Sequence, residues 1–430
     1  MSRGPRQGRA ARPRSLYRQA LATPGAIGFV VPGFVGRMSI AMVGIGLVLL
    51  VSSVTDSYGI AGGVAATFAL AQSLAGPFVG RLMDRLGQAR VLLPAVAVHA
   101  GAMLALVAAA ESGAPTWTLF VAAGMSGAAF PSLGSLVRAR WSHLLGRLRP
   151  SALDAAYALE SVGDEVIFVL GPVLVTVLST EVERSAGVLA ALAFTVTGSL
   201  VLAAHRGSEP PASGASGVRG RSALRSPAVR AVSLVFGGAG LVFAGGEVSV
   251  IAYAEEAGNR SDAGWLLALV AVGSMLSGIV YGARTWRSPL WRRFALGACG
   301  FGGGTVLMAL APSVPLLGVA AFVFGLGVSP TLIPGFALIA RYAPDGRLTE
   351  AMSWATTMLG VGIAVGSSGA GRAVDLAGPG YALWLVAVAG LATVVAAAAS
   401  VPVVAAADRE RTGETVPLTG TGGGASAQDG

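Results

Sequence analysis

Residues 80–90, Gly-Arg-Leu-Met-Asp-Arg-Leu-Gly-Gln-Ala-Arg, lie between two long apolar segments near 60–81 and 90–110. Each apolar segment is long enough to cross the hydrocarbon core of a bilayer as a helix. The stretch between them carries three arginines and one aspartate, and charged side chains are costly at membrane depth. The sequence therefore predicts two membrane-spanning helices joined by a short charged loop.

The same alternation of apolar segments and charged loops continues along the 430-residue chain. Apolar residues make up 54% of the sequence and charged residues 12%, and the mean hydropathy of +0.70 is far outside the range of soluble domains. We therefore predict an all-α membrane protein with twelve transmembrane helices. The predicted helices span residues 27–54, 60–81, 90–110, 116–138, 152–178, 187–204, 229–252, 263–283, 294–312, 314–340, 350–373 and 381–405.

The predicted helices fall into two groups of six. Residues 27–204 form an N-terminal half and residues 229–405 a C-terminal half. Residues 205–228, between the halves, are rich in proline, glycine and arginine, which is typical of a linker outside the membrane. An arginine-rich tail, 1–26, precedes the first helix, and the Gly/Thr/Ala-rich tail, 406–430, is expected to be disordered.

The distribution of arginine predicts the orientation of the chain, because cytoplasmic loops retain positive charge. All thirty basic residues are arginines. With the N-terminus inside, only Arg184, Arg260 and Arg372 fall outside, Arg37 falls within a helix, and the other 26 lie in cytoplasmic loops and tails. We therefore expect the cell membrane as the location, both termini in the cytoplasm and the lipid bilayer as a partner. Nucleic acid is not an expected partner, because the arginines do not gather on one soluble face.

A weak internal repeat relates the two halves. A shift of 202 residues aligns Gly76 with Gly278 and Gly80 with Gly282. Six helices separate the copies, so both cross the membrane in the same direction and the halves are parallel repeats. Chance matching in a sequence this rich in alanine and glycine is the alternative. Glycines four residues apart also indicate that a neighbouring backbone packs closely against each helix.

The loop at 80–90 resembles the signature loop of the major facilitator superfamily. Two basic positions of that family's pattern are replaced here, by Gln88 and Ala89. The resemblance implies a fold of two parallel six-helix halves and transport by alternating access. The residues that match the pattern are Gly80, Asp84, Arg85, Gly87 and Arg90.

The resemblance also implies that this loop takes part in gating. The Asp84 carboxylate would hold the cytoplasmic ends of the two halves together while the protein is open to the outside. Arg138 and Arg140, at the end of the fourth helix, are candidate gating partners, because a carboxylate accepts charge-assisted hydrogen bonds from arginine. The alternative is a capping turn whose arginines only set the topology.

Ionisable residues within the predicted helices mark a candidate pathway for substrate or protons, because charge at membrane depth is usually kept for function. Glu160 and Asp164 share one face of the fifth helix, whereas Glu165 points about 100° away from Asp164. Arg37, in the first helix, lies at similar depth, so we predict an ion pair between Arg37 and either Glu160 or Asp164. Alternatively, Glu160 lies among the headgroups and Arg37 extends towards the cytoplasm. Glu247, in the seventh helix, is a further candidate.

Together these features predict a secondary active transporter of a small molecule, working as a monomer. Apolar helices with few polar side chains favour a hydrophobic or amphiphilic substrate. Gly171-Pro172 resembles a pattern of proton-coupled exporters in the superfamily, but Gly163 is eight residues upstream instead of four and the trailing glycines are absent, so the motif leaves the direction open. Proton-coupled efflux is preferred because the apolar helices favour a hydrophobic or amphiphilic substrate. The alternatives are proton-coupled uptake of a small metabolite or sugar, and a membrane sensor that does not transport. We expect no enzyme activity, metal or cofactor, because the three histidines lie in separate segments and no metal-ligand cluster is present.

Overall fold

The structure is a computed structural model that describes residues 16–146, 149–212, 222–258 and 262–412. Within these ranges the regular elements are all helical and no strand is present. A helix satisfies its backbone hydrogen bonds internally, as the interior of a bilayer requires. The predicted all-α membrane fold is therefore confirmed.

The N-terminal half contains six spans, of which the fourth is built from two helices. The spans are α2 (Ala26–Thr55), α3 (Tyr58–Leu86), α4 (Gln88–Glu111), α5 (Trp117–Ala128) with α6 (Leu133–Leu145), α7 (Pro150–Val177) with the π-helical turn η1 (Leu178–Val182), and α8 (Ala186–Ala204).

The sequence predicts the fourth span as one helix over 116–138, but the span consists of two helices, α5 and α6. Residues 129–132 interrupt it, and Pro131 lies in this break. Proline lacks a backbone N–H and disfavours the helical conformation of the residue before it. The second part, α6, continues to Leu145, so Arg138 lies inside a helix and not at its end.

The C-terminal half also contains six spans, and its last two are continuous. The helices are α9 (Pro227–Glu256), α10 (Asp262–Ala283), α11 (Leu290–Ala309), α12 (Val314–Tyr342) and α13 (Leu348–Thr412). Within α13, Gly378 has φ 83° and ψ 171°, a backbone conformation that glycine adopts readily. It divides α13 into a first arm (348–377) and a second arm (379–412), which gives the twelve predicted spans.

Parts of the predicted tails and linker are ordered. A short helix, α1 (Leu16–Leu21), lies in the segment predicted as a tail, and α13 runs to Thr412, into the segment predicted to be disordered. The linker contains two 3-10 turns, η2 (Arg206–Ser208) and η3 (Ala223–Arg225). Residues 1–15, 213–221 and 413–430, with Arg260, lie outside the described residues.

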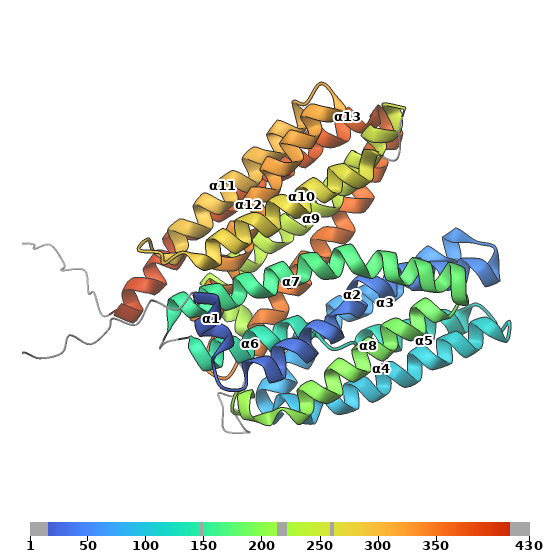
Figure 1. The fold of residues 1–430 in the computed structure, drawn as a ribbon, viewed down its shortest axis with the longest axis horizontal. Coiled ribbons are helices and arrows are strands. Elements are labelled where there is room, and N and C mark those ends of the chain that lie inside the picture. The colour runs from blue at the N-terminus through green and yellow to red at the C-terminus, as the bar shows by residue number, and fades with distance from the viewer. Residues whose placement is uncertain (1–15, 147–148, 213–221, 259–261, 413–430) are drawn as a thin grey trace, which may run out of the picture.

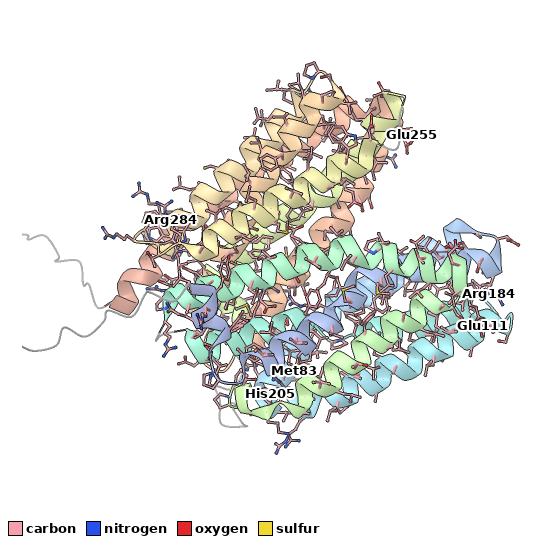
Figure 2. All side chains as sticks on the ribbon, in the orientation of Figure 1. Met83, Glu111, Arg184, His205, Glu255 and Arg284 are labelled. Atoms are coloured by element: carbon pink, nitrogen blue, oxygen red, sulfur yellow. The ribbon has the colours of Figure 1, made fainter. Side chains whose placement is uncertain are left out.

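The two halves meet at one end of the molecule and diverge towards the other (Figure 1). Figure 2 locates the meeting end by Met83, His205 and Arg284, and the diverging end by Glu111, Arg184 and Glu255. We call these the arginine-rich end and the acidic end, after the loops that each carries.

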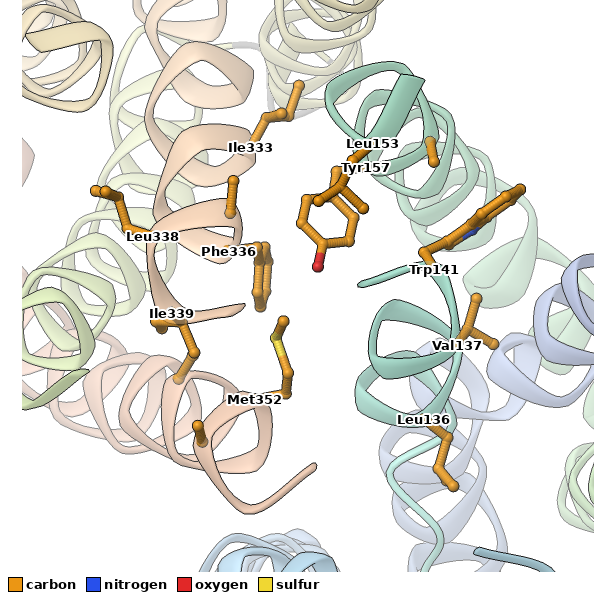
Figure 3. Packing of buried hydrophobic residues seen from close by; sticks show 14 of the residues in the cluster. Leu136, Val137, Trp141, Leu153, Tyr157, Ile333, Phe336, Leu338, Ile339 and Met352 are labelled. Atoms are coloured by element: carbon orange, nitrogen blue, oxygen red, sulfur yellow. The ribbon is translucent and has the colours of Figure 1, made fainter. Parts of the chain in front are cut away.

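The apolar cores follow the same division. One cluster contains residues of the N-terminal half only, among them Leu47 and Met103, and another contains residues of the C-terminal half only, among them Phe301. A third cluster combines both halves near the arginine-rich end. Figure 3 shows its interface, where Tyr157 and Phe336 approach each other from opposite halves. Apolar packing therefore joins the halves at this end only, among the described residues.

Candidate functional site: a buried ion network and two interfaces between the halves

A buried arginine in α2 binds both acids of α7 that the sequence analysis offered as alternatives. The Arg37 guanidinium is 2% exposed and forms a salt bridge with Glu160, which is 1% exposed. It also donates to Oδ1 of Asp164 at 2.7 Å and to the Gly33 carbonyl of its own helix at 3.1 Å. The predicted ion pair is thus confirmed, with both acids as partners. In the alternative, Glu160 lies among the headgroups and Arg37 extends towards the cytoplasm, whereas in the structure the two side chains are buried against each other.

Two side chains of α6 complete this network. Arg138 donates to Oδ2 of Asp164 at 2.6 Å, and the Trp141 indole N–H donates to Oε1 of Glu160 at 2.8 Å. Each acid therefore has a donor from α2 and a donor from α6. We call Arg37, Arg138, Trp141, Glu160 and Asp164 the ion network.

The charges of the ion network balance, with two arginines and two acids. A buried charge is tolerated when it is paired and hydrogen-bonded, because the partners replace the lost hydration. Asp164 is the accessible member, since its side chain is 32% exposed while Arg37 and Glu160 are covered. The guanidinium of Arg138 also lies 4.2 Å from the ring centre of Phe336 in α12, so the network touches the C-terminal half.

The structure corrects the predicted gating partners of Asp84. Arg138 pairs with Asp164, as described above. Arg140 donates to Gln88, to the carbonyls of Leu202 and His205, and to the Ser208 hydroxyl, at 2.8–3.1 Å. The sequence analysis placed both arginines at the end of the fourth helix, whereas α6 continues beyond them to Leu145, and their hydrogen bonds run to other residues of the N-terminal half and of the linker.

Interface A is formed by α3 and the first arm of α13, which belong to different halves. A Cβ atom at Gly80 would lie 2.8 Å from the Ser353 hydroxyl, so only glycine permits this approach. One turn away, Gly76 faces Thr357, whose hydroxyl donates to the Ser73 carbonyl at 3.0 Å. The close packing predicted from the glycine spacing therefore occurs between the two halves.

The Asp84 carboxylate lies at the arginine-rich end of interface A. Its two oxygens accept hydrogen bonds from the backbone N–H groups of Thr349 and Glu350, at 2.9 and 2.8 Å. These N–H groups belong to the first turn of α13, where the helix dipole favours negative charge. The carboxylate thus joins the ends of two helices from opposite halves.

Glu350 is a second anchor of interface A, which the sequence analysis did not identify. It is fully buried and accepts two hydrogen bonds from Arg81, at 2.8 and 3.1 Å. It also accepts hydrogen bonds from the Ser222 hydroxyl and the Ala223 N–H of the linker, at 2.8 and 3.0 Å. One side chain of the C-terminal half therefore holds both α3 and the linker.

The remaining residues of the matched loop have simpler positions. Gly87 separates α3 from α4 with φ 99° and ψ 146°, which side chains rarely allow. Glu209 of the linker accepts a hydrogen bond from the Ala89 N–H at 3.2 Å, next to this glycine. Arg85 and Arg90 are exposed.

Interface B is formed by α7 and α10, and it is the counterpart of interface A. Gly282 faces Ala158 with no room for a larger side chain, whereas a Cβ atom at Gly278 would lie 2.9 Å from the Ser329 hydroxyl of the same half and 3.6 Å from Val162 of α7. Of the second predicted glycine pair, Gly282 therefore packs closely between the halves, and Gly278 packs most closely against α12 of its own half.

Charged and polar groups secure the arginine-rich end of interface B. Arg293 of α11 donates to Asp154 of α7 at 2.7 Å and to the Tyr281 hydroxyl at 2.8 Å. The Tyr17 hydroxyl of α1 donates to the Ile279 carbonyl at 2.8 Å and to the Gly278 carbonyl at 3.2 Å. Burial raises the pKa of Tyr17 to about 12, so the hydroxyl remains a donor at neutral pH.

Not every predicted pathway residue belongs to these groupings. Glu247 is exposed on α9, and the ion network does not include it. Among the described residues, no three His, Cys, Asp or Glu side chains are arranged to hold a metal ion.

Comparison with known proteins places these features in a family context. The sequence matches the model of the Major Facilitator Superfamily over residues 30–258 and 235–421. A comparison with curated protein sequences gave no significant match.

Several solved structures share the fold at low sequence identity. A bacterial homologue of the iron transporter ferroportin, described in an outward-facing state, has a TM-score of 0.72 at 17% identity, over 87% of this chain and 98% of that one. The human organic anion transporter MFSD10 (TETRAN) has a TM-score of 0.68 at 17% identity, over 87% and 100%. FucP, described as a Major Facilitator Superfamily transporter in the outward conformation, has a TM-score of 0.65 at 14% identity, over 87% and 99%.

Proposed function

Since the chain belongs to the Major Facilitator Superfamily, we propose that it is a secondary active transporter that exports a small hydrophobic or amphiphilic molecule in exchange for protons. The ion network is the observation that carries this proposal. Two arginines and two acids are held inside the N-terminal half of a multi-pass membrane protein, where charge is costly unless it serves a function.

The proposed cytoplasmic side is the arginine-rich end, which follows from the positive-inside rule. The halves are joined at that end, so the conformation corresponds to one that is open to the outside. The outward-facing descriptions of two matched structures are consistent with this assignment. An impermeant thiol reagent should label Ser112→Cys in intact cells, in a Cys299→Ala background, while Thr285→Cys should be labelled only after the membrane is opened. The reverse pattern would overturn the orientation.

Asp164 is the proposed site of proton uptake, because it is the exposed acid of the network. Protonation would remove the negative charge that Arg138 binds at 2.6 Å, and would leave Arg138 with a surplus charge. Since Arg138 also stacks on Phe336 of the C-terminal half, a shift of this side chain changes a contact between the halves. Proton binding would in this way alter the relative stability of the two conformations.

The proposal is tested by flux in proteoliposomes under an imposed pH gradient. Purified protein should move the amphiphilic dye Hoechst 33342 against its gradient when the proton gradient runs in the opposite direction, and Asp164→Asn should abolish this coupling. Movement of dye and protons in the same direction would establish uptake instead of efflux. The absence of proton-linked flux for the dye and for a set of sugars would favour the non-transporting sensor and contradict the proposal.

A further inference from the structure

A recess at the acidic end of the N-terminal half belongs neither to the ion network nor to the two interfaces. It lies where the end of α2 meets the turn between α7 and α8, and Figure 2 shows Arg184 at this end. Asp56, at the end of α2, lies about 28 Å beyond Arg37 at the helical rise of about 1.5 Å per residue. The recess has a volume of about 400 Å³, which is typical of a site for a small molecule. Its polar lining residues are Ser52, Ser53, Asp56, Ser179, Thr180 and Arg184.

The recess contains one acid and one base that do not pair with each other. Asp56 and Arg184 both line it, and neither forms a salt bridge with another residue that the structure describes. Both residues are exposed, so a ligand can reach them from the solvent. A molecule that carries one charge of each sign matches this lining, because each of its charged groups then has a partner of opposite charge.

The hydroxyl groups of the recess determine which kind of cationic group fits. Ser52 and Ser53 donate to carbonyls of α2, at 3.3 and 2.7 Å, and Thr180 donates to the Glu181 carboxylate at 3.2 Å. A hydroxyl has one proton and two lone pairs, so these three oxygens remain as acceptors. Together with the Asp56 carboxylate they favour a group with several N–H donors. A primary ammonium group has such donors, whereas a quaternary ammonium group has none.

The backbone on both sides of the recess departs from regular helix. Asp56 has φ 51° and ψ 27°, and among the described residues it alone has a positive φ without being glycine. The opposite side is the π-helical turn η1, in which the buried Ser179 hydroxyl has no hydrogen-bond partner among the described residues. Both kinds of departure cost energy and occur often at functional sites. Two of them at one recess, with an unused hydroxyl, indicate a binding site.

We propose that this recess binds a zwitterion whose primary ammonium group meets Asp56 and the hydroxyl oxygens, and whose anionic group meets Arg184. A phosphoethanolamine group has this chemistry, whether it is the head group of a lipid or part of a soluble molecule. All the lining residues belong to the N-terminal half, so movement of one half against the other does not enclose the recess. The ligand is therefore distinct from a transported molecule, whose site has to become accessible from each side in turn.

The test compares two soluble probes, glycerophosphoethanolamine and glycerophosphocholine, which differ only in three methyl groups on the nitrogen. Calorimetric titration of the purified full-length protein in detergent should show about tenfold or more tighter binding of the ethanolamine compound, because methylation removes its N–H donors. Asp56→Asn should weaken binding of this compound by about tenfold or more. Asparagine tolerates a positive φ, so this variant keeps the local backbone.

Two further variants distinguish the recess from the charged surface around it. Arg184→Gln should weaken the binding of both probes alike, because both carry the phosphate. Glu183→Gln is the matched control, since Glu183 is an exposed acid at the same end that does not line the recess, and it should bind like the wild type. Equal binding of the two probes, binding of the ethanolamine compound that Asp56→Asn leaves unchanged, or no binding of either probe would each overturn the inference.

The source of the zwitterion is tested with the protein reconstituted in vesicles of equal parts phosphatidylethanolamine and phosphatidylcholine. Native mass spectrometry after extraction should show retained phosphatidylethanolamine in the wild type and less in Asp56→Asn if the ligand is a lipid. Binding of the soluble probe without retention of this lipid supports a free zwitterion as the ligand. Retention of both lipids in equal amounts, unaffected by Asp56→Asn, would contradict recognition of the ammonium group by this recess.

Discussion

Interfaces A and B have the same architecture and different chemistry. In both, a glycine related by the repeat, Gly80 in A and Gly282 in B, lets a helix of one half approach a helix of the other. At the arginine-rich end, interface A is held by Asp84 on the first turn of α13, and interface B by the ion pair of Asp154 and Arg293. The shift that relates the halves puts Trp286 at the position of Asp84, and Trp286 packs against the Tyr281 ring at 4.9 Å.

The two interfaces share the close approach of their helices but not the charged contacts that hold them. Close approach of helices depends on small residues at fixed spacing, so the glycines persist in both copies. The carboxylate can come from either helix of an interface, because its role is to hold two helix ends together. Interface B accordingly takes its acid from α7 and adds the Tyr17 hydroxyl of α1. At its inner end, interface A continues with Ser73, which faces Gly360.

The largest effect is expected from the ion network. It holds α7, which is a helix of interface B, and it includes no residue of the two helices of interface A. Arg37→Gln leaves Glu160 without a cationic partner, at a cost of about 3–5 kcal/mol for a broken buried pair. The yield and thermal stability of the purified protein should fall accordingly. In the double variant Arg37→Gln/Glu160→Gln one charge of each sign is removed and the pair of Arg138 and Asp164 remains, so stability should recover in part. Strictly additive losses would show that the two residues are not coupled.

A smaller effect is expected from the charges that hold each interface. Asp84→Asn and Asp154→Asn should each lower transport about tenfold while leaving membrane insertion intact, because a charge-assisted hydrogen bond contributes about 1.5–3 kcal/mol. A second substitution can restore the contact only in interface B, because Asp154 binds a side chain whereas Asp84 binds backbone N–H groups. Exchanging the partners in Asp154→Arg/Arg293→Asp should restore transport in interface B, since the pair joins two side chains. No recovery in the exchange variant would mean that the pair does not hold the interface.

The smallest effect is expected from Tyr17→Phe, which removes two hydrogen bonds to α10 and keeps the ring. The change should favour opening of the arginine-rich end by about 0.5–1.5 kcal/mol. The raised pKa of Tyr17, about 12, favours the neutral hydroxyl, so its contribution should be constant below pH 10 and lost as the pH rises through 12. Thiol labelling of Thr285→Cys in opened membranes should become faster in the variant. An unchanged rate would make α1 irrelevant to opening.

The sequence was informative where one residue type has one physical consequence. Apolar length predicted the spans, and the cost of charge at membrane depth predicted that Arg37 pairs with an acid of α7. Glycine spacing predicted close packing at Gly80 and Gly282, but not that both contacts lie between the halves. That choice of partner depends on tertiary arrangement, which spacing along one helix does not encode.

The parts that escaped prediction depend on contacts distant in sequence or on the exact course of a helix. Asp154 and Arg293 are separated by 139 positions, and nothing local to either residue identifies the other. The sequence analysis offered Arg138 as a partner of Asp84 because it placed the end of the fourth helix at residue 138. In the structure, α6 continues to Leu145. Pro131 indicates a break before α6, but the apolar residues around this proline favour a single helix.

The central claim is that the two ends of the molecule open alternately and that protonation within the ion network drives the exchange. It can be tested by measuring two distances between spin labels in the same reconstituted protein, in a Cys299→Ala background. One pair, at Leu86 and Thr285, reports on the arginine-rich end, and the other, at Ser112 and Leu310, on the acidic end. Lowering the pH from 8 to 5 should lengthen the first distance and shorten the second, and Asp164→Asn should remove the pH response. Distances that do not change with pH, or that both change in the same direction, would contradict it.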